Sequence, residues 1–152
     1  MFDLTGKTAL VTGASGGIGE AVARALYTQG ATVVLHGTRA EKLESLQQQL
    51  GDRAFVMAVD LSDRDQLAGL IEAAIRLAGP ISILVNNAGI TRDGLLMRMK
   101  DDDWDTVLEV NMTASMSLCR AAMRGMMKAK TGRIISISSV VGVTGNPGQA
   151  NY

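Results

Sequence analysis

The chain has 152 residues, 47% of them hydrophobic, so we expect one domain over 1–152 with a sizeable core. Its 15 basic and 15 acidic side chains cancel, so we expect no nucleic-acid or membrane-surface partner. One cysteine and one histidine exclude an internal disulfide and predict no metal site. No apolar run approaches the roughly 20 residues that cross a bilayer, and the start lacks the basic and apolar regions of a signal peptide, so we expect a cytoplasmic protein.

The first pattern with chemical meaning is a glycine-rich turn between a predicted strand at 7–11 and a helical pattern that runs to Gly30. Such a turn offers unpaired backbone N–H groups and the positive end of the helix dipole to a pyrophosphate. Gly13 would allow the tight turn, Gly17 the close approach of the phosphates, and Gly19 the packing of helix on strand. The candidate binding residues of the turn are Gly13, Ser15, Gly16, Gly17, Ile18 and Gly19. Their G-x-x-x-G-x-G spacing also fits a plain strand-to-helix turn that binds nothing.

Strands and helices alternate along the rest of the chain. Strands are predicted at 31–36, 54–59, 81–85 and 133–138, and helices at 40–50, about 63–77 and about 103–128. Short connections and right-handed crossovers then predict an α/β fold with helices on both faces of a doubly wound parallel sheet, whose first four strands lie in the order 3-2-1-4. The ligand crevice would lie at the carboxyl ends of the first and fourth strands. The run 86–89, Asn-Asn-Ala-Gly, falls in that crevice, where it would hold a turn, face a ligand, or both.

The long helix predicted at 103–128 is apolar on two faces. One stripe is Leu108, Met112, Met116, Cys119, Met123 and Met127, and the other is Val110, Ala114, Leu118, Ala121 and Gly125. One stripe must cover the sheet, so we expect the other to meet a second helix in a contact between subunits of a homo-oligomer.

Several motifs, taken together and at their spacings, resemble one enzyme family. They are the glycine turn from Thr12 to Gly19, Asp60, the Asn-Asn-Ala-Gly run, Asn111, Ser139 and Tyr152. Over all 152 residues the chain resembles the short-chain dehydrogenases/reductases. The resemblance implies a Rossmann-type fold with strand order 3-2-1-4-5, lacking the family's last two strands. Residues 90–100 and 145–152 resemble, more closely, the bacterial 3-oxoacyl-[acyl-carrier-protein] reductases.

The resemblance also implies roles for single residues. Tyr152 would be the general acid that protonates a carbonyl oxygen as hydride arrives from the nicotinamide. Ser139 would hydrogen-bond the same carbonyl, and Asn111 would hold a water of the proton relay. Taken alone, a serine such as Ser139 is more often a strand-end residue, and an asparagine such as Asn111 is more often a tolerated polar residue of a helix. The further cofactor-binding residues implied by the family are Asp60, near the adenine amino group, Leu61, Asn87, Ala88 and Gly89.

The end of the second strand predicts which nicotinamide cofactor is bound. A carboxylate there would accept the ribose 2′-hydroxyl of NAD, but residues 31–40 contain no acid. Arg39 offers its charged fork, and Thr38 its hydroxyl, to a 2′-phosphate, so we expect NADP(H). The alternative is that Arg39 merely begins the next helix in solvent. We expect His36 to lie partly exposed beside the adenosine.

The reductase resemblance implies that the substrate is a 3-oxoacyl thioester carried by an acyl-carrier protein, in fatty-acid biosynthesis, and that the intact family forms tetramers. We expect Lys128, Lys130 and Arg133 to lie near the active edge of the sheet, where they would contact an acidic carrier protein. The alternative is that they are simply exposed to solvent at a helix end. A short-chain alcohol, steroid or sugar dehydrogenase and a non-catalytic NADP-binding subunit remain alternatives.

The family motif continues to a lysine four residues beyond the tyrosine, and the sequence ends at Tyr152. That lysine would bind the nicotinamide ribose and supply the positive charge that lowers the tyrosine pKa from about 10. We therefore expect residues 1–152 to be the N-terminal part of a reductase, with little or no reductase activity alone.

Overall fold

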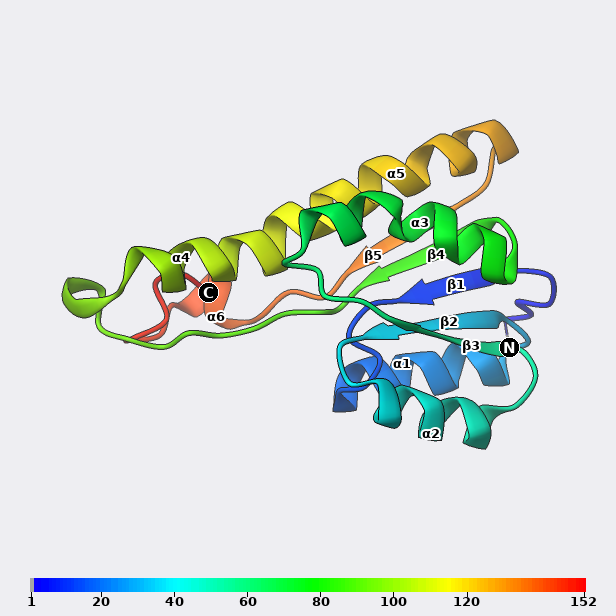
Figure 1. Ribbon diagram of the computed structural model, residues 1–152, viewed down its shortest axis with the longest axis horizontal. Coiled ribbons are helices and arrows are strands. Elements are labelled where there is room, and N and C mark those ends of the chain that lie inside the picture. The colour runs from blue at the N-terminus through cyan, green and yellow to red at the C-terminus, as the bar shows by residue number, and fades with distance from the viewer. Residues whose placement is uncertain (1) are drawn as a thin grey trace.

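The computed structural model describes residues 2–152. At its centre is a five-stranded sheet in the order β3-β2-β1-β4-β5, whose paired strands all run parallel. The strands are β1 (Thr8–Val11), β2 (Thr32–Gly37), β3 (Ala54–Ala58), β4 (Ile81–Asn86) and β5 (Arg133–Ser136). The helices are α1 (Gly17–Thr28), α2 (Ala40–Leu50), α3 (Arg64–Ala78), α4 (Asp101–Leu108), α5 (Ala114–Ala129) and α6 (Val141–Thr144), with a 3-10 turn η1 (Leu96–Arg98) and a π-helical segment η2 (Glu109–Thr113). The predicted α/β class and strand order are confirmed (Figure 1).

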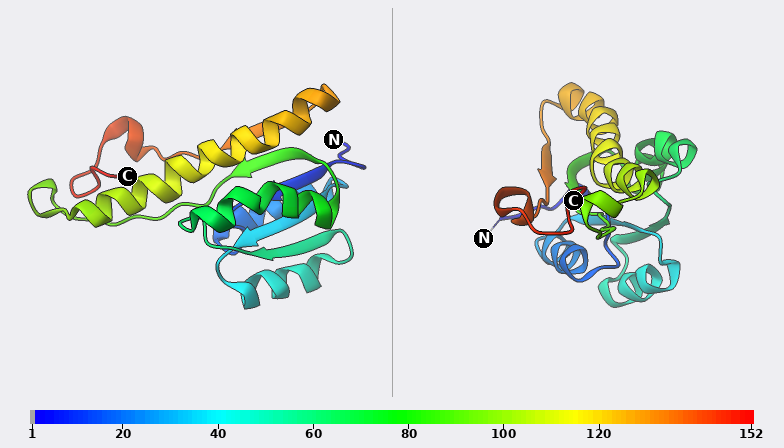
Figure 2. Two further views of the ribbon diagram at one scale, coloured as in Figure 1. Left: turned by 45° about the horizontal axis from the view of Figure 1, so that its top comes forward. Right: turned by 90° about the vertical axis from the view of Figure 1, so that its left-hand side faces the viewer.

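Helices cover both faces of the sheet (Figure 2). Because successive side chains of a strand point to opposite faces, each of the strands β1 to β4 contributes to two apolar clusters. Leu10 and Leu84 pack with α3 and α5 on one face, whereas Leu35 and Val85 pack with α1 and α2 on the other. The sheet is therefore buried on both faces along its centre, as a parallel sheet requires.

The predicted helix over 103–128 begins two residues earlier, at Asp101, and contains a π-helical segment that the sequence did not indicate. In η2 the Ala114 N–H donates to the Glu109 carbonyl, five residues back instead of four. The helix ends after Ala129 with Lys130 in the left-handed region, at a φ of 52°. The N–H of Lys130 donates to the Met127 carbonyl, which closes the last turn.

The two apolar stripes of this long helix have different environments. Ala114 and Leu118 are buried in the core on one face of the sheet, whereas Val110 is buried outside that core. Farther along the helix the buried residues are Ala122 and Met126, not Ala121 and Gly125 of the stripe. The other stripe contains four methionines whose side chains are exposed: Met112, Met116, Met123 and Met127. These four methionines therefore have no cover within residues 2–152, whereas Cys119 of the same stripe packs against the core. The predicted subunit contact there stays a prediction.

The positions of three basic residues correct the sequence analysis. The helix α5 runs back along the sheet, away from the carboxyl ends of the strands (Figure 1). Arg133 pairs with Ile83 near the start of β4, whereas Ser136 pairs with Asn86 at its end. Lys128, Lys130 and Arg133 therefore lie at the amino edge of the sheet, and the expectation that they lie near this chain's active edge is wrong.

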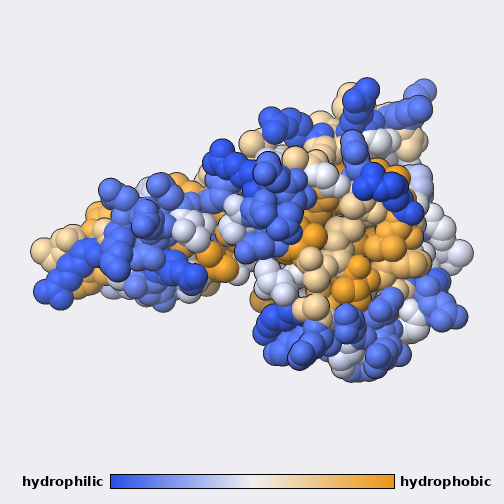
Figure 3. All heavy atoms as spheres, in the orientation of Figure 1, coloured by the Kyte–Doolittle hydropathy of each residue, from blue (hydrophilic) through white to orange (hydrophobic). Residues whose placement is uncertain are grey.

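Both outer strands of the sheet carry apolar side chains to the surface. Phe55 and Val56 of β3 are half-buried, and apolar residues gather between α3 and α2 on the face shown in Figure 3. On the other edge, Ile134 and Ile135 of β5 are exposed. The strand β5 ends at Ser136, two residues before its predicted end. No helix within residues 2–152 is long and apolar enough to cross a membrane.

Candidate functional site

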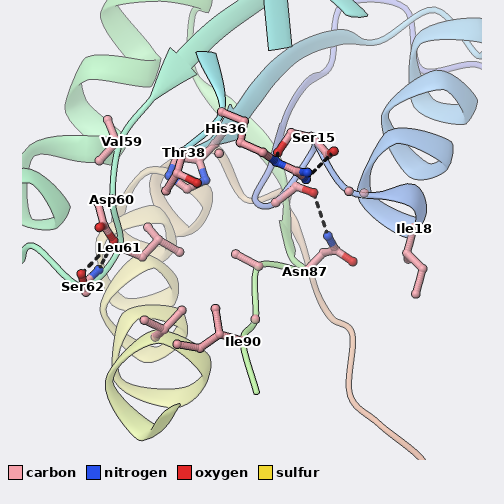
Figure 4. A pocket seen from close by; sticks show the side chains of 18 of the residues that line it. Ser15, Ile18, His36, Thr38, Val59, Asp60, Leu61, Ser62, Asn87 and Ile90 are labelled. Carbon is pink, nitrogen blue, oxygen red and sulfur yellow. Dashed lines mark hydrogen bonds between the residues drawn. The ribbon is translucent and has the colours of Figure 1, made fainter. Parts of the chain in front are cut away.

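A cleft of about 530 Å³ opens at the carboxyl edge of the sheet. Its walls are the glycine turn after β1, the end of β2, the loop after β3, the loop after β4, and the α4–η2 helix (Figure 4). Every residue predicted to bind the cofactor lines this cleft, from Gly13 to Gly19 on one side to Asn87, Ala88 and Gly89 on the other. The structure thus brings these residues together around one cleft.

The three glycines of the turn differ in what surrounds them. Gly13 adopts a φ of +66°, which only glycine adopts without strain. A Cβ on Gly19 would lie 2.6 Å from Asn87 Nδ2 and 2.8 Å from the Gly13 carbonyl carbon, so α1 packs too closely on the turn for any side chain. A Cβ on Gly17 would meet nothing within 4 Å. Gly17 therefore borders open space within the cleft, whereas Gly13 and Gly19 are required by the turn itself.

The start of α1 has no side-chain cap in the described chain. Gly16 is the N-cap residue, and it has no side chain to accept a hydrogen bond from the first turn of the helix. The first N–H groups of a helix need such partners, and an anion at this end is also stabilised by the helix dipole. The cleft therefore presents an uncapped helix start, which fits a pyrophosphate group.

Two polar side chains fasten the glycine turn to the loop after β4. Thr12 Oγ1 accepts hydrogen bonds from the N–H of Asn87 at 2.9 Å and of Ala88 at 3.0 Å, and donates to the Val85 carbonyl at 3.2 Å. Asn87 Nδ2 donates to the carbonyls of Thr12 at 3.0 Å and Gly13 at 3.3 Å. Asn87 therefore holds the turn, one of the two roles that the sequence left open.

Asn86, by contrast, faces away from the cleft. It is buried, and its Nδ2 donates to Cys119 Sγ at 3.2 Å and to Ser136 Oγ at 3.4 Å, so it joins β4 to α5 and β5.

Arg39 lies over the glycine turn at the rim of the cleft. Its Nη2 donates to the Ser15 carbonyl at 2.7 Å and its Nε to Ser15 Oγ at 3.2 Å. These contacts hold the guanidinium beside Ser15 and Thr38, which line the same end of the cleft. Arg39 is also the N-cap residue of α2. It therefore begins that helix, as the alternative from the sequence held, and lines the cleft at the same time.

His36 is fully buried, with 1% of its surface exposed, and the expectation of a partly exposed ring is wrong. Neither ring nitrogen has a hydrogen-bond partner within residues 2–152. Burial lowers the pKa of His36 to about 4, and the Val59 backbone and the Asp60 carboxylate only partly oppose this shift. The ring is therefore neutral at pH 7 and forms part of the wall beneath the cleft.

The loop after β3 forms the far wall. Asp60 Oδ1 accepts hydrogen bonds from the Ser62 N–H at 2.9 Å and the Ser62 hydroxyl at 2.8 Å (Figure 4). Its other carboxylate oxygen has no partner within the described chain and remains available to a ligand. Leu61 is 4% exposed and packs in the core, so its side chain offers a ligand little contact.

Asn111 fixes the loop after β4 to the π-helical segment. Its Oδ1 accepts from the Ile90 N–H at 2.8 Å, and its Nδ2 donates to the Ile90 carbonyl at 2.9 Å. Both polar atoms of the side chain are thus used, and a relay water would have to share them with Ile90. This reciprocal pair was not foreseen from the sequence.

The structure does not bring Ser139 and Tyr152 into the lining of the cleft. Ser139 Oγ accepts from the Val141 N–H at 3.2 Å, at the start of the short helix α6. Tyr152 is 42% exposed, beside α4 in the part of the molecule that extends beyond the carboxyl edge of the sheet (Figure 1). Both residues lie on the side of the carboxyl edge of the sheet, as expected, but outside the wall of the cleft.

Several residues that line the cleft were not predicted. Val59, Ser62, Ile90, Arg92, Thr106 and Val110 are among them. Thr106 and Val110 lie four residues apart on one face of the long helix, a spacing that could have indicated a common wall.

Comparison with known proteins identifies the family. Residues 7–152 match the family described as short chain dehydrogenase. The chain belongs to the short-chain dehydrogenase family. Members of this family are oxidoreductases that bind nicotinamide cofactors, and the open space at Gly17 and the uncapped start of α1 fit the pyrophosphate of such a cofactor.

Among its relatives in the family is Nodulation protein G of Rhizobium sp. (strain N33), 61% identical over 152 residues, which are all of this chain and 62% of the relative. The 3-oxoacyl-[acyl-carrier-protein] reductase FabG of Rickettsia felis is 50% identical over 152 residues, all of this chain and 61% of the relative. The same-named protein of Haemophilus influenzae is 47% identical over 98% of this chain and 62% of its own length. The chain thus spans about six-tenths of the length of these short-chain dehydrogenases.

Proposed function

We propose that this chain is the cofactor-binding part of an NADPH-dependent 3-oxoacyl-[acyl-carrier-protein] reductase, with residues 1–152 folding as one domain. The observation that carries the proposal is the pairing of an open glycine turn with Arg39 at the end of a β2 strand that offers no carboxylate. An acid there would bind the 2′-hydroxyl of NAD and repel a 2′-phosphate.

The residues that would hold the cofactor follow from the walls of the cleft. Gly17 and the start of α1 would receive the pyrophosphate, Asp60 the adenine, and Asn87, Ala88 and Gly89 the nicotinamide half. The Arg39 guanidinium, held beside Ser15, and the Thr38 hydroxyl would bind the 2′-phosphate. The bound nicotinamide would supply the hydride.

The chain's own residues would manage the proton. Tyr152 would donate its hydroxyl proton to the substrate carbonyl oxygen, and the Ser139 hydroxyl would hydrogen-bond the same oxygen. Asn111 would contribute by fixing the loop that carries Ile90, next to the nicotinamide end of the cleft. Because a free tyrosine has a pKa of about 10, this chemistry requires positive charge near Tyr152.

The substrate is proposed from the relatives' names. FabG proteins at 50% identity and below are named as reductases of 3-oxoacyl-[acyl-carrier-protein], which points to a thioester on an acidic carrier. The Nodulation protein G relative is more similar, at 61%, and its name states no substrate. This favours, as a second candidate, a reductase with the same cofactor and proton chemistry and a different carbonyl substrate.

We also propose that the exposed methionine stripe of α5 is a contact between subunits. Met116, Met123 and Met127 expose 46–70% of their surface along one side of α5, and a second helix would remove that apolar surface from water. Sedimentation of the full-length protein as a monomer at micromolar concentration would exclude this contact.

Two measurements on the full-length protein test the function. The first replaces Arg39 by Asp and compares NADPH and NADH binding, with Arg76→Asp, an exposed residue of α3, as the charge-matched control. Loss of the charge-assisted bonds and repulsion by the new carboxylate should weaken NADPH binding about ten- to hundredfold. NADH, which has no 2′-phosphate, should bind at least as tightly as to the unmodified protein. An unchanged preference for NADPH in Arg39→Asp would refute the cofactor assignment.

The second measurement follows NADPH oxidation with a 3-oxoacyl thioester on an acyl-carrier protein. Turnover by the full-length enzyme supports the reductase proposal. Turnover only with a different carbonyl compound favours the second candidate and refutes the first.

A further inference from the structure

Two loops that are far apart in the sequence are joined beside the candidate general acid. Residues 148–151, just before Tyr152, lie against residues 92–94 of the loop after β4 and against the start of α4 (Figure 1). The Gly94 N–H donates to the Gly148 carbonyl at 2.8 Å. Gln149 Nε2 donates to both carboxylate oxygens of Asp93, at 3.1 and 3.2 Å. We refer to these contacts between 92–94 and 148–151 as the clasp.

The buried part of the clasp is Asn151, the neighbour of Tyr152. Asn151 is 5% exposed, and its Nδ2 donates to the Arg92 carbonyl at 3.0 Å and the Asp103 carbonyl at 3.4 Å. Its Oδ1 is buried without a partner within residues 2–152, and an unpaired buried acceptor costs about 1–3 kcal/mol. The buried amide of Asn151 thus joins two separate backbone segments. Tyr152 itself is 42% exposed, and its N–H donates to the Gln149 carbonyl at 3.1 Å within the same segment.

The same loop is also tied to the cofactor cleft. Ile90 lines the cleft and exchanges two hydrogen bonds with Asn111. Only Thr91 lies between Ile90 and the first residue of the clasp, Arg92. The loop after β4 therefore connects the wall of the cleft to the segment that carries Tyr152, and the clasp is the connection at its far end.

We propose that Gln149 and Asp93 are positioning residues that close the clasp and thereby set the place of Tyr152 relative to the cleft. The proposal rests on the reductase function stated above. It assigns no chemical step to either side chain. Both lie on the exposed side of the clasp, whereas Asn151 forms its buried side, so substitutions at 149 and 93 test positioning with less risk to the fold.

The decisive variant is Gln149→Glu in the full-length enzyme. It changes the amide donor to a carboxylate facing the carboxylate of Asp93, and like charges at this distance repel. Because small displacements of a reacting group cost large factors in rate, we expect kcat to fall about tenfold or more, with KM for NADPH changed less than about twofold. Adding Asp93→Asn restores an amide–carboxylate pair with its direction reversed, so the double variant should recover most of the lost kcat.

Hydrogen exchange gives a readout that does not depend on activity. The Gly94 amide should exchange faster in Gln149→Glu and return to its original protection in the double variant, because its bond to Gly148 belongs to the clasp. The Ile90 amide, bonded to Asn111, is the internal control and should keep its protection in all variants.

Three results would overturn the proposal: an unchanged kcat in Gln149→Glu, a kcat that the second substitution does not restore, or unchanged exchange at Gly94. If the unmodified enzyme reduces no 3-oxoacyl thioester, the reductase function fails by itself. The exchange at Gly94 in the single and double variants then still decides whether the clasp exists.

Discussion

The substitutions Gly17→Ala and Gly19→Ala form a matched pair that separates folding from binding within one turn. Each adds a single methyl group, two residues apart. On Gly19 the methyl would lie 2.6 Å from Asn87 Nδ2 and still closer to the backbone of Gly13, atoms that the Thr12–Asn87 hydrogen bonds hold in place. On Gly17 it would enter open space.

The expected stability change follows from these surroundings. Forcing a methyl into a packed site costs about 1–3 kcal/mol, and in a domain of this size 1 kcal/mol lowers Tm by about 2–4 °C. Gly19→Ala should therefore lower Tm by about 2–12 °C. Gly17 lies at the first position of α1 with an ordinary backbone conformation, so Gly17→Ala should leave stability unchanged or raise it by up to about 1 kcal/mol.

Binding should show the opposite order. The methyl of Gly17→Ala would occupy the space in which the phosphates are proposed to lie, so NADPH affinity should fall about tenfold or more although the protein is as stable as before. Thermal denaturation and nucleotide titration of both full-length variants provide the measurements. Equal stability of Gly19→Ala and the unmodified protein, or unimpaired NADPH binding by Gly17→Ala, would refute the reasoning about the respective glycine.

Two further predictions concern buried polar groups. Thr12→Val leaves the N–H groups of Asn87 and Ala88 without their acceptor and should lower the free energy of unfolding, measured in urea, by about 1–3 kcal/mol. Thr12→Ser keeps the hydroxyl and should lower it less. Equal losses of stability in the two variants would contradict this role of the hydroxyl. For His36, the folded pKa of about 4 lies below the value of about 6.5 in the unfolded chain, so between these pH values only the unfolded chain takes up the proton. The free energy of unfolding should therefore fall by roughly 3 kcal/mol as pH drops from 6.5 to 4, and level off below pH 4. His36→Leu should remove this part of the pH dependence. If the stability of the variant depends on pH as steeply as that of the unmodified protein, other groups cause the dependence.

The strand order and the cleft were predictable from the sequence for a physical reason. Short connections between parallel strands allow few arrangements, and they bring every strand's carboxyl end to one edge. Residues next to strand ends, such as Gly13, Arg39 and Asn87, therefore fall in one place without knowledge of any side-chain contact.

The incorrect expectations concern residues whose surroundings depend on distant parts of the chain. His36 is buried because the loop at Val59 and Asp60 covers it, and strand periodicity does not reveal that cover. Lys130 lies at the amino edge because α5 runs the full length of the sheet before β5 begins. The role expected of Tyr152 is not among these errors and stays a prediction; the residue lies in a long segment after β5 that contacts the loop after β4. A strand end can be predicted from local pattern, but a loop that packs on another loop cannot.

The π-helical segment η2 has a consequence for how the long helix tolerates changes in length. One residue of an α-helix corresponds to a rotation of about 100° around its axis. Removing one residue from Glu109–Thr113 would restore regular α-helical bonding and turn α4 by about that angle against α5, with the sheet-facing side of α5 unchanged. Val107 would leave its buried place, and the Asp103 carbonyl would turn away from Asn151. The extra residue thus sets the rotational phase between the half of the helix that packs on the sheet and the half that reaches the segment bearing Tyr152.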